Sequence, residues 1–224
     1  MVSAAKYRIA KELDVPAKMR DGTTLFADIY RPDTEGKFPV LLLRLPYGKQ
    51  FISDFSDHEF FVPRGYIVVI QDTRGRFSSE GDFTPLFDEP LDGYDTVEWA
   101  AKLPWSNGKV GTIGQSYLGA TQYLTSWTAP PSLRCQVPVS AAADFHSGWV
   151  YDVGGALVHG WMIPYAIFLA RDTIERLGLK EELWPKVRPY LDRSINFANP
   201  LTAEAYRRLP LMEWAELLNE AAPY

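Results

Sequence analysis

Short runs of apolar residues alternate with amphipathic stretches over residues 1–143. Residues 24–31 follow an Arg-Asp-Gly turn, alternate apolar and polar side chains, and predict a half-exposed strand that ends at Pro32. Four continuous apolar runs come after it, and such runs are typical of parallel strands that are buried on both faces. These runs cover residues 38–45, 66–70, 110–113 and 135–139.

Two helices are predicted between these strands. Residues 92–102 carry apolar side chains at helical spacing and end before Pro104 and the Asn107-Gly108 turn. Residues 117–127 are predicted to form the second helix. Strands that alternate with helices predict an α/β fold with a doubly wound, mostly parallel sheet joined by right-handed crossovers.

The pattern changes after Ala143. Residues 144–224 contain helical stretches, among them 163–177 and 203–220, and no further β-rich run. Prolines divide this part into short helices. We therefore expect two regions, with residues 1–143 forming the α/β part and residues 144–224 forming a helical region.

Composition and charge narrow the class of protein. The chain is 46% hydrophobic, which is ample for a packed core, and its 23 basic and 28 acidic residues do not gather into long blocks. We therefore expect no nucleic-acid partner. The amino terminus, residues 1–8, has no apolar core of signal-peptide length, and no later run approaches the roughly 20 apolar residues of a membrane span. The sequence thus predicts a soluble, cytoplasmic protein without membrane contact.

Cysteine usage and motifs argue against cofactors. Cys135 is the only cysteine, so the chain forms no internal disulfide, and its apolar neighbours predict a small core residue on a buried strand. The sequence has no Walker-type loop, no Gly-x-Gly-x-x-Gly after a strand, and no His or Cys pair at metal-ligand spacing. We expect neither a metal nor another cofactor.

The strongest chemical signal lies where the strand at 110–113 runs through Gly114-Gln-Ser116 into the helix at 117–127. This pattern is typical of a nucleophile elbow, whose strained backbone lifts a serine hydroxyl clear of the sheet. The helix amino terminus beside it favours developing negative charge. Gly114 and Gly119 supply the small residues that such a turn needs, although small residues alone also suit a purely structural turn. We take Ser116 as the candidate nucleophile.

Four motifs follow one another along the chain. They are Arg44-Leu-Pro-Tyr-Gly-Lys49, Gln71-Asp-Thr-Arg-Gly-Arg-Phe-Ser-Ser-Glu-Gly-Asp-Phe83, Tyr94-Asp-Thr-Val-Glu-Trp99 and Gly114-Gln-Ser-Tyr-Leu-Gly119. Together and in this order they resemble the cocaine esterase and X-Pro dipeptidyl-peptidase group of α/β-hydrolases, often called CocE/NonD. The resemblance runs from about Arg8 to Ala156 and more loosely through the helical region, which would then be the family's cap. It implies the α/β-hydrolase fold, with residues 1–143 as the amino-terminal part of the hydrolase domain.

The resemblance also implies roles for individual residues. Ser116 would be acylated by an ester or amide substrate. The hydroxyl of Tyr47 and the backbone N–H of Tyr117 would form the oxyanion hole, since a tetrahedral oxyanion needs fixed donors. The alternative for Tyr47 is an aromatic side chain that packs against the core at a strand end.

Two further groups of residues are candidates for substrate contact. Trp149, Tyr151 and Trp161 lie at the start of the helical region and are candidates for lining an apolar acyl pocket, although such aromatic residues often form a core. Asp72, Arg74, Glu80 and Asp82 follow a strand, where α/β sheets bind ligands. For this charged group we favour a salt bridge that fixes the loop over a role in substrate binding.

A serine hydroxyl needs a base, which is normally a histidine oriented by a carboxylate. The chain has three histidines, of which His58 lies in a polar stretch and is expected to be exposed or near the site rim. His146 and His159 flank Asp152, so the order Ser, Asp, His is formally satisfied. Both lie where the cap begins rather than on closing strands, and we expect neither to act. The family's later Asp and His motifs do not occur here.

These observations predict a serine hydrolase of esters, amides or short peptides that lacks its triad Asp and His in this chain. A truncated reading frame, a proteolytic fragment and a split enzyme completed by a carboxyl-terminal chain are equally compatible with that expectation. The alternative is a catalytically inactive fragment that acts only as an interaction module. A third hypothesis is an acyltransferase, since an alcohol or amine can capture the same acyl-enzyme.

Overall fold

The structure is a computed structural model that describes residues 3–53, 58–152, 154–179, 181 and 184–185. It divides into two compact units, Met1–Ala143 and Asp144–Tyr224, and each is described here by itself. The helix predicted at residues 203–220 lies outside the described residues.

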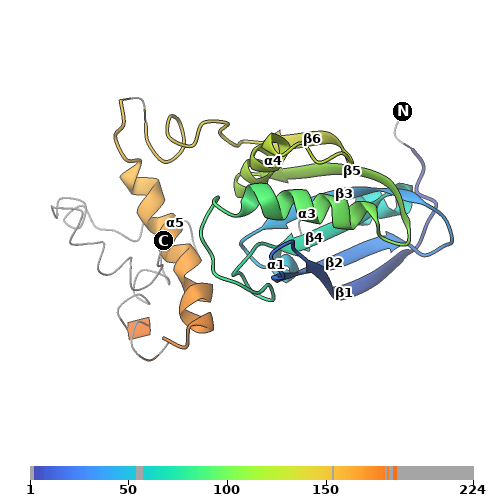
Figure 1. The fold of residues 1–224 in the computed structure, drawn as a ribbon, viewed down its shortest axis with the longest axis horizontal. Helices are drawn as coiled ribbons and strands as arrows, with labels where there is room; N and C mark the ends of the chain where they lie inside the picture. The colour runs from blue at the N-terminus through green and yellow to red at the C-terminus, as the bar shows by residue number, and fades with distance from the viewer. Residues whose placement is uncertain (1–2, 54–57, 153, 180, 182–183, 186–224) are drawn as a thin grey trace. The chain divides into compact units, whose positions relative to one another are not determined.

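The first unit is built on a six-stranded sheet with the strand order β1-β2-β4-β3-β5-β6 (Figure 1). The strands β1 and β4 both pair antiparallel with β2, while β4, β3, β5 and β6 run parallel to one another. This arrangement confirms the predicted α/β fold with a mostly parallel sheet. The strands are β1 Ile9–Lys18, β2 Thr24–Pro32, β3 Phe38–Leu45, β4 Ile67–Asp72, β5 Ser106–Gln115 and β6 Leu133–Val139.

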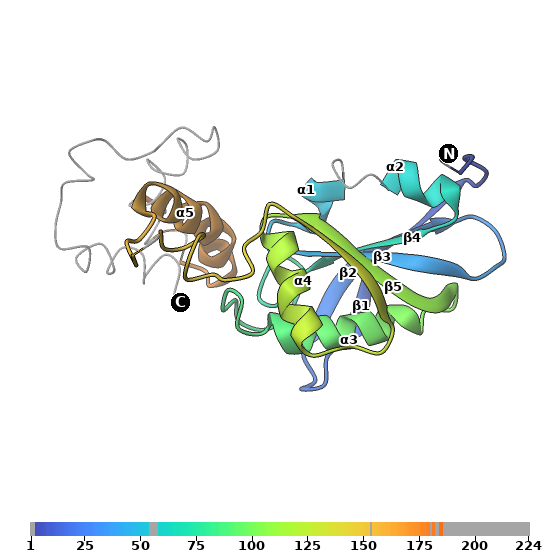
Figure 2. The same ribbon diagram turned by 90° about the horizontal axis from the view of Figure 1, so that it is seen from above.

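Helices cover both faces of this sheet, as a doubly wound fold requires (Figure 2). On one face, Val97 and Ala100 of α3 pack against the buried side chains of β2, β3, β4 and β5. On the other face, Val62 packs against Tyr30 and the alternate side chains of β3 and β4. The helices of the first unit are α1 Lys49–Ser53, α2 His58–Phe61, the 3₁₀ helix η1 Val62–Arg64, α3 Glu89–Ala101 and α4 Tyr117–Trp127.

The first strand, β1, was not predicted, and it changes the environment of β2. It pairs with β2 over most of its length, so β2 lies between two strands. Residues 27–30 of β2 are all buried, because helices cover both faces of the sheet there. The prediction of a half-exposed strand at residues 24–31 was therefore wrong about burial.

The last described strand, β6, departs from the prediction in the opposite direction. It was expected to be buried on both faces, but it forms an edge of the described sheet and four of its seven residues are exposed. Cys135 is one of these exposed residues. The prediction of a buried core cysteine was wrong, because an apolar run does not distinguish a central strand from an edge strand.

The second unit contains the helix α5 His159–Arg176, which confirms the helix predicted at residues 163–177 and begins earlier than expected. The segment before it is held by isolated bridges that pair Tyr151 with Ser147 and with Leu157. Asp144 accepts hydrogen bonds from the backbone N–H groups of His146 and Ser147. Among the described residues, no helix combines the length and apolar character that crossing a bilayer requires.

Candidate active site

Ser116 lies at the junction between β5 and α4. Its backbone has φ 60° and ψ −122°, a conformation that non-glycine residues rarely adopt and that costs about 1–3 kcal/mol. The N–H of Ser116 donates to the carbonyl of Val139 at 2.9 Å, and its own carbonyl accepts from Gly119 and Ala120. The predicted strand–turn–helix is confirmed, and hydrogen bonds on both sides hold the serine in its strained conformation.

Close packing explains the two glycines that flank Ser116. Gly114 has φ 155°, and a Cβ there would lie 3.0 Å from Cδ2 of Leu118. A Cβ on Gly119 would lie 2.5 Å from that of Ala141. A side chain at Gly114 would therefore push the start of α4 away from the end of β5, and one at Gly119 would push it away from the segment after β6. Ser116 would move in either case.

The side chain of Tyr117 anchors the start of α4. This buried phenol donates to Oε1 of Glu89 at 3.1 Å and accepts from the N–H of Leu86 at 3.0 Å. Glu89 is held in turn by Nη1 of Arg44 at 2.6 Å. Burial and the nearby Glu89 raise the pKa of Tyr117 well above its usual value, so the phenol stays protonated.

The backbone N–H of Tyr117 directly follows Ser116. It belongs to the first residue of α4, and the first N–H groups of a helix have no acceptor within the helix. The phenol holds the residue in place. The role of this N–H as an oxyanion donor stays a prediction.

Tyr47 follows the carboxyl end of β3, which is the parallel neighbour of β5. Its ring meets the ring of Tyr117 edge to face, with the centroids 6.4 Å apart. The ring also packs against the core cluster that contains Leu45 and Leu118. Tyr47 thus packs as a core aromatic and also lies beside the residue that follows Ser116, at the sheet edge where α/β proteins bind ligands.

The charged loop after β4 is fixed by partners from other segments. Arg74 pairs with Asp92 of α3 at 2.6 Å and with Asp21 at 2.8 Å, rather than with the acidic residues of its own loop. Glu80 accepts the backbone N–H of Thr24 at 2.8 Å. Asp82 is exposed. The expected salt bridge therefore exists, although its acidic partners are not the ones that the sequence indicated.

Lys49 was missed at the sequence level. Only 1% of its side chain is exposed, and its Nζ lies 2.6 Å from Asp14 and 3.4 Å from Asp28. Its backbone N–H donates to Oδ1 of Asp72 at 2.7 Å. These three aspartates belong to β1, β2 and β4, so no spacing along the chain connects them to a lysine after β3. Among the described residues, no group of histidine, cysteine and carboxylate side chains is arranged to hold a metal ion.

His58 is buried rather than exposed, which corrects the prediction. Its ring packs on Tyr30, with the centroids 4.2 Å apart, because α2 covers this face of the sheet. Tyr30 is the register partner of Val68, Val68 of Leu41, and Leu41 of Gly111 in β5. Tyr30 therefore lies three strands from Gly111, or roughly 14 Å across the sheet, and Gly111 lies roughly 16 Å along β5 from Ser116. His58 is therefore too far away to act as its base.

The other two histidines belong to the second unit. His146 is exposed, and its ring stacks on Tyr151 with the centroids 4.9 Å apart. Its Nδ1 lies 3.5 Å from Oγ of Ser147. His159 is the first residue of α5. The expectation that neither acts as the base of Ser116 stays a prediction.

The three aromatic candidates for an acyl pocket each contact a different ring in the second unit. Trp161 is 46% exposed, and the ring that it contacts belongs to Tyr165 of the same helix, α5. Their role in a pocket stays a prediction. The ring pairs are Trp149 with Phe145 at 5.4 Å, Tyr151 with His146 at 4.9 Å and Trp161 with Tyr165 at 6.2 Å.

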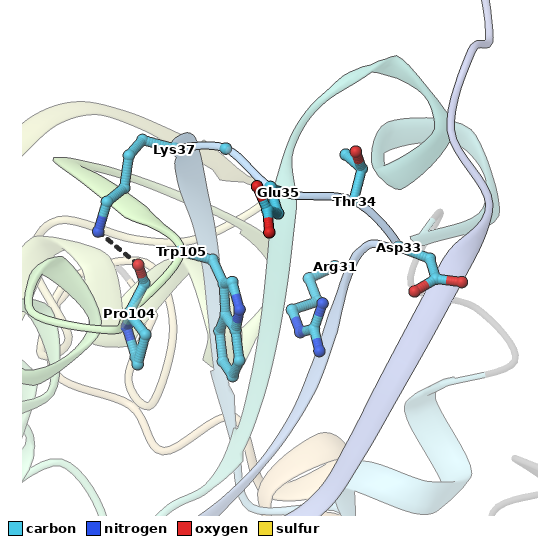
Figure 3. Close-up of a pocket in the computed structure, with 8 residues that line it drawn as sticks. Arg31, Asp33, Thr34, Glu35, Lys37, Pro104 and Trp105 are labelled. Atoms are coloured by element: carbon cyan, nitrogen blue, oxygen red, sulfur yellow. Dashed lines mark hydrogen bonds between the residues drawn. The ribbon is translucent and has the colours of Figure 1, made fainter.

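A pocket of about 530 Å³ lies at the end of the sheet that is opposite to Ser116 (Figure 3). Arg31 lies over the ring of Trp105 at its centre, with 4.1 Å between the guanidinium carbon and the ring centroid. The pocket adjoins the amino ends of β3 and β5, where Phe38 pairs with Ser106. A strand the length of β5 spans about 30 Å, so this pocket is separate from Ser116.

Comparison with known proteins identifies the family. The sequence profile of the X-Pro dipeptidyl-peptidase (S15) family matches residues 21–216. The chain is 44% identical over 155 residues to a cocaine esterase from Rhodococcus sp. (strain MB1 Bresler), an alignment that covers 67% of this chain and 27% of the esterase. It is 27% identical over 127 residues to a putative Xaa-Pro dipeptidyl-peptidase from Bacillus anthracis, which covers 50% of this chain and 21% of that protein.

A solved structure gives the same result. The crystal structure of a CocE/NonD family hydrolase from Staphylococcus aureus aligns with a TM-score of 0.69 and 32% sequence identity, over 74% of this chain and 34% of that one. The chain therefore spans about a fifth to a third of the length of these relatives, which are hydrolases. The match over residues 21–216 shows that this chain belongs to the X-Pro dipeptidyl-peptidase (S15) family.

Proposed function

We propose that this chain carries the nucleophile and the oxyanion hole of a serine hydrolase that cleaves ester or amide bonds, with Ser116 as the nucleophile. The strained backbone of Ser116 between β5 and α4 is the observation that carries this proposal. Such strain is stored at functional sites, and a turn with a purely structural role gains nothing from a serine in this conformation.

In the proposed reaction, Oγ of Ser116 attacks the substrate carbonyl carbon and loses its proton to a base. The carbonyl oxygen becomes an oxyanion that accepts hydrogen bonds from the Tyr47 hydroxyl and the Tyr117 N–H. Collapse of this intermediate expels the protonated alcohol or amine and leaves an acyl ester on Ser116. Water then attacks the ester and releases the acid.

The base is the part of the triad that the described residues leave unassigned. His58 is too far from Ser116, and we expect His146 and His159 to take no part. We infer that the histidine and its carboxylate come from outside this chain, because His58, His146 and His159 are its three histidines. We further propose that the chain acts in the cytoplasm. Its substrate would be a small ester, amide or X-Pro peptide, by analogy with the cocaine esterase and the Xaa-Pro dipeptidyl-peptidase that it resembles.

Hydrolysis of p-nitrophenyl acetate by purified wild type, Ser116→Ala and Ser126→Ala tests this proposal. Ser126 is a matched control, since it is an exposed serine on the same helix. Without its base Ser116 attacks an activated ester only slowly, so we expect a slow but measurable rate in the wild type, to which oxyanion donors and binding alone also contribute. The part that passes through the acyl-enzyme should be lost in Ser116→Ala, which lowers the rate, and kept in Ser126→Ala. Equal rates in all three proteins would refute the proposal.

Exposed apolar side chains favour a second candidate function, in which the chain is one partner of a complex. Val137 and Val139 of β6 are 49% and 42% exposed, and Trp127 at the end of α4 is 82% exposed. An edge strand with apolar side chains is a template for pairing with another chain. Light scattering should then show self-association that Val137→Lys weakens. A monomer at all concentrations would leave the hydrolase proposal as the better one.

A further inference from the structure

The segment that carries Tyr47 has no regular structure of its own. Residues 46–48 lie between the end of β3 and the start of α1, and Gly48 has φ 94°. A tyrosine on such a segment reaches a fixed position only where other residues hold the backbone. The position of its hydroxyl therefore depends on the contacts of residues 45–49.

The last residue of β4 and the loop after it hold this segment on both sides of Tyr47. On one side, Nε of Arg76 donates to the carbonyl of Pro46 at 2.9 Å. On the other side, Oδ1 of Asp72 accepts the backbone N–H of Lys49 at 2.7 Å. The ring of Phe77 lies against Gly48, 3.1 Å from where a Cβ would be.

The charged groups that make these contacts are buried. The side chains of Lys49 and Asp72 are both 1% exposed, and Arg76 as a whole is 2% exposed. Nζ of Lys49 donates to Asp14 at 2.6 Å and to Ser78 at 3.4 Å. Buried charges in such a network have little freedom to move, since each loses its partner if it does.

Arg76 is further restrained by aromatic rings. Its guanidinium carbon lies 4.6 Å from the ring centroid of Phe83 and 5.5 Å from that of Phe77. An arginine that is stacked, buried and hydrogen-bonded to a backbone carbonyl is a rigid support. The carbonyl that it holds belongs to the residue directly before Tyr47.

We propose that Asp72, Arg76 and Lys49 are positioning residues for Tyr47, which hold its hydroxyl where the oxyanion forms on a substrate attached to Ser116. This inference rests on the proposed function. It gives the charged motif after β4 a role in catalysis through Tyr47, in place of contact with substrate.

Steady-state hydrolysis of p-nitrophenyl acetate tests the proposal with the variants Asp72→Ala and Arg76→Met. Loss of one oxyanion donor costs about 10²- to 10³-fold in kcat, so displacement of Tyr47 should lower kcat about 10- to 100-fold and leave KM unchanged. Arg74→Met is the matched control. It also removes an ion-paired arginine from this loop, but its partners are Asp92 and Asp21. The control should keep the wild-type kcat.

Combination with Tyr47→Phe shows whether the effect passes through Tyr47. In the Tyr47→Phe background, Asp72→Ala and Arg76→Met should cause no further loss of kcat, because the hydroxyl that they position is gone. Losses that multiply would overturn the proposal, and so would an equal loss of kcat in Arg74→Met.

Amide hydrogen exchange gives a readout that does not depend on activity. The N–H groups of Tyr47 and Gly48 should exchange faster in Asp72→Ala and Arg76→Met than in the wild type or Arg74→Met. Unchanged exchange would overturn the positioning role whether or not the chain hydrolyses the ester. If exchange is faster but hydrolysis is the same in the wild type and Ser116→Ala, the positioning of Tyr47 by Asp72 and Arg76 is supported and only the proposed function is refuted.

Discussion

At Ser116 the demands of function and stability oppose each other. The backbone has φ 60° and ψ −122°, which glycine adopts at little cost and a residue with a Cβ does not. The chain nevertheless has serine there, held by hydrogen bonds to the carbonyl of Val139 and from Gly119 and Ala120. A hydroxyl-bearing side chain in this conformation is what supports the proposed chemical role of Ser116.

Replacement of Ser116 measures this strain. Ser116→Gly should be more stable than Ser116→Ala by about 1 kcal/mol, because only glycine adopts the observed φ without strain. Chemical denaturation of the two variants gives the difference. At Ser126, which is helical, the order should reverse, with glycine about 0.5–1 kcal/mol less stable than alanine. The same order at both positions would show that the backbone of Ser116 is not strained.

The pH dependence of stability reports on Asp72. Burial raises the pKa of Asp72 to about 7, and the Lys49 N–H only partly offsets this effect. Between about pH 4 and pH 7 the folded chain keeps a proton that the unfolded chain has released, so stability falls as pH rises through this window. Asp72→Asn does not titrate. The difference in the free energy of unfolding between the wild type and Asp72→Asn should therefore fall as the pH rises from about 4 to 7. A difference that stays constant over this range would contradict the raised pKa of Asp72.

On the scale of elements, one buried network joins β3, β4, α3 and the start of α4. Arg44 of β3 bonds to Gln71 of β4 at 2.9 Å and to Glu89 of α3 at 2.6 Å. Glu89 accepts a hydrogen bond from the phenol of Tyr117, and Gln71 accepts one from the hydroxyl of Thr96. The network thus connects the sheet and a covering helix to the residue after Ser116.

Disruption of this network should show strong coupling. Arg44→Met or Glu89→Leu alone leaves a buried charge unpaired and should cost about 3–5 kcal/mol, while the double variant should cost clearly less than the sum. Urea denaturation of the four proteins measures the coupling. The pair Arg20–Asp95 at 2.8 Å is the control, since Arg20 is 48% exposed and such pairs contribute about 0–1 kcal/mol. Additive losses at Arg44 and Glu89 would contradict the account.

On the scale of the whole molecule, the sequence predicted features that depend on residues close together in the chain. The strands β3 and β4 and the middle of β5 were found because burial on both faces makes residues 38–45, 66–70 and 110–113 largely apolar. The start of β5 was missed, because Asn107-Gly108 was interpreted as a turn although it lies within the strand. The turn at Ser116 was found because strand, Gly-x-Ser and helix adjoin one another.

Features that depend on contacts between distant segments were missed or wrong. The strand β1 carries Lys11, Glu12 and Asp14, which obscure its periodicity, and it becomes a strand through pairing with β2. The partners of Lys49 come from three separate strands, and the burial of His58 depends on how α2 packs on the sheet. No pattern along the chain reports such contacts.

Mass-spectrometric mapping of the covalent adduct is the most direct test of the central claim, that Ser116 is the nucleophile. The chain is incubated with excess fluorophosphonate, digested and mapped. We predict slow formation of an adduct on Ser116, at the same rate in His146→Ala and His159→Ala, and no adduct at this site in Ser116→Ala. An adduct on a different serine, or fast labelling of Ser116 that His159→Ala abolishes, would contradict the account.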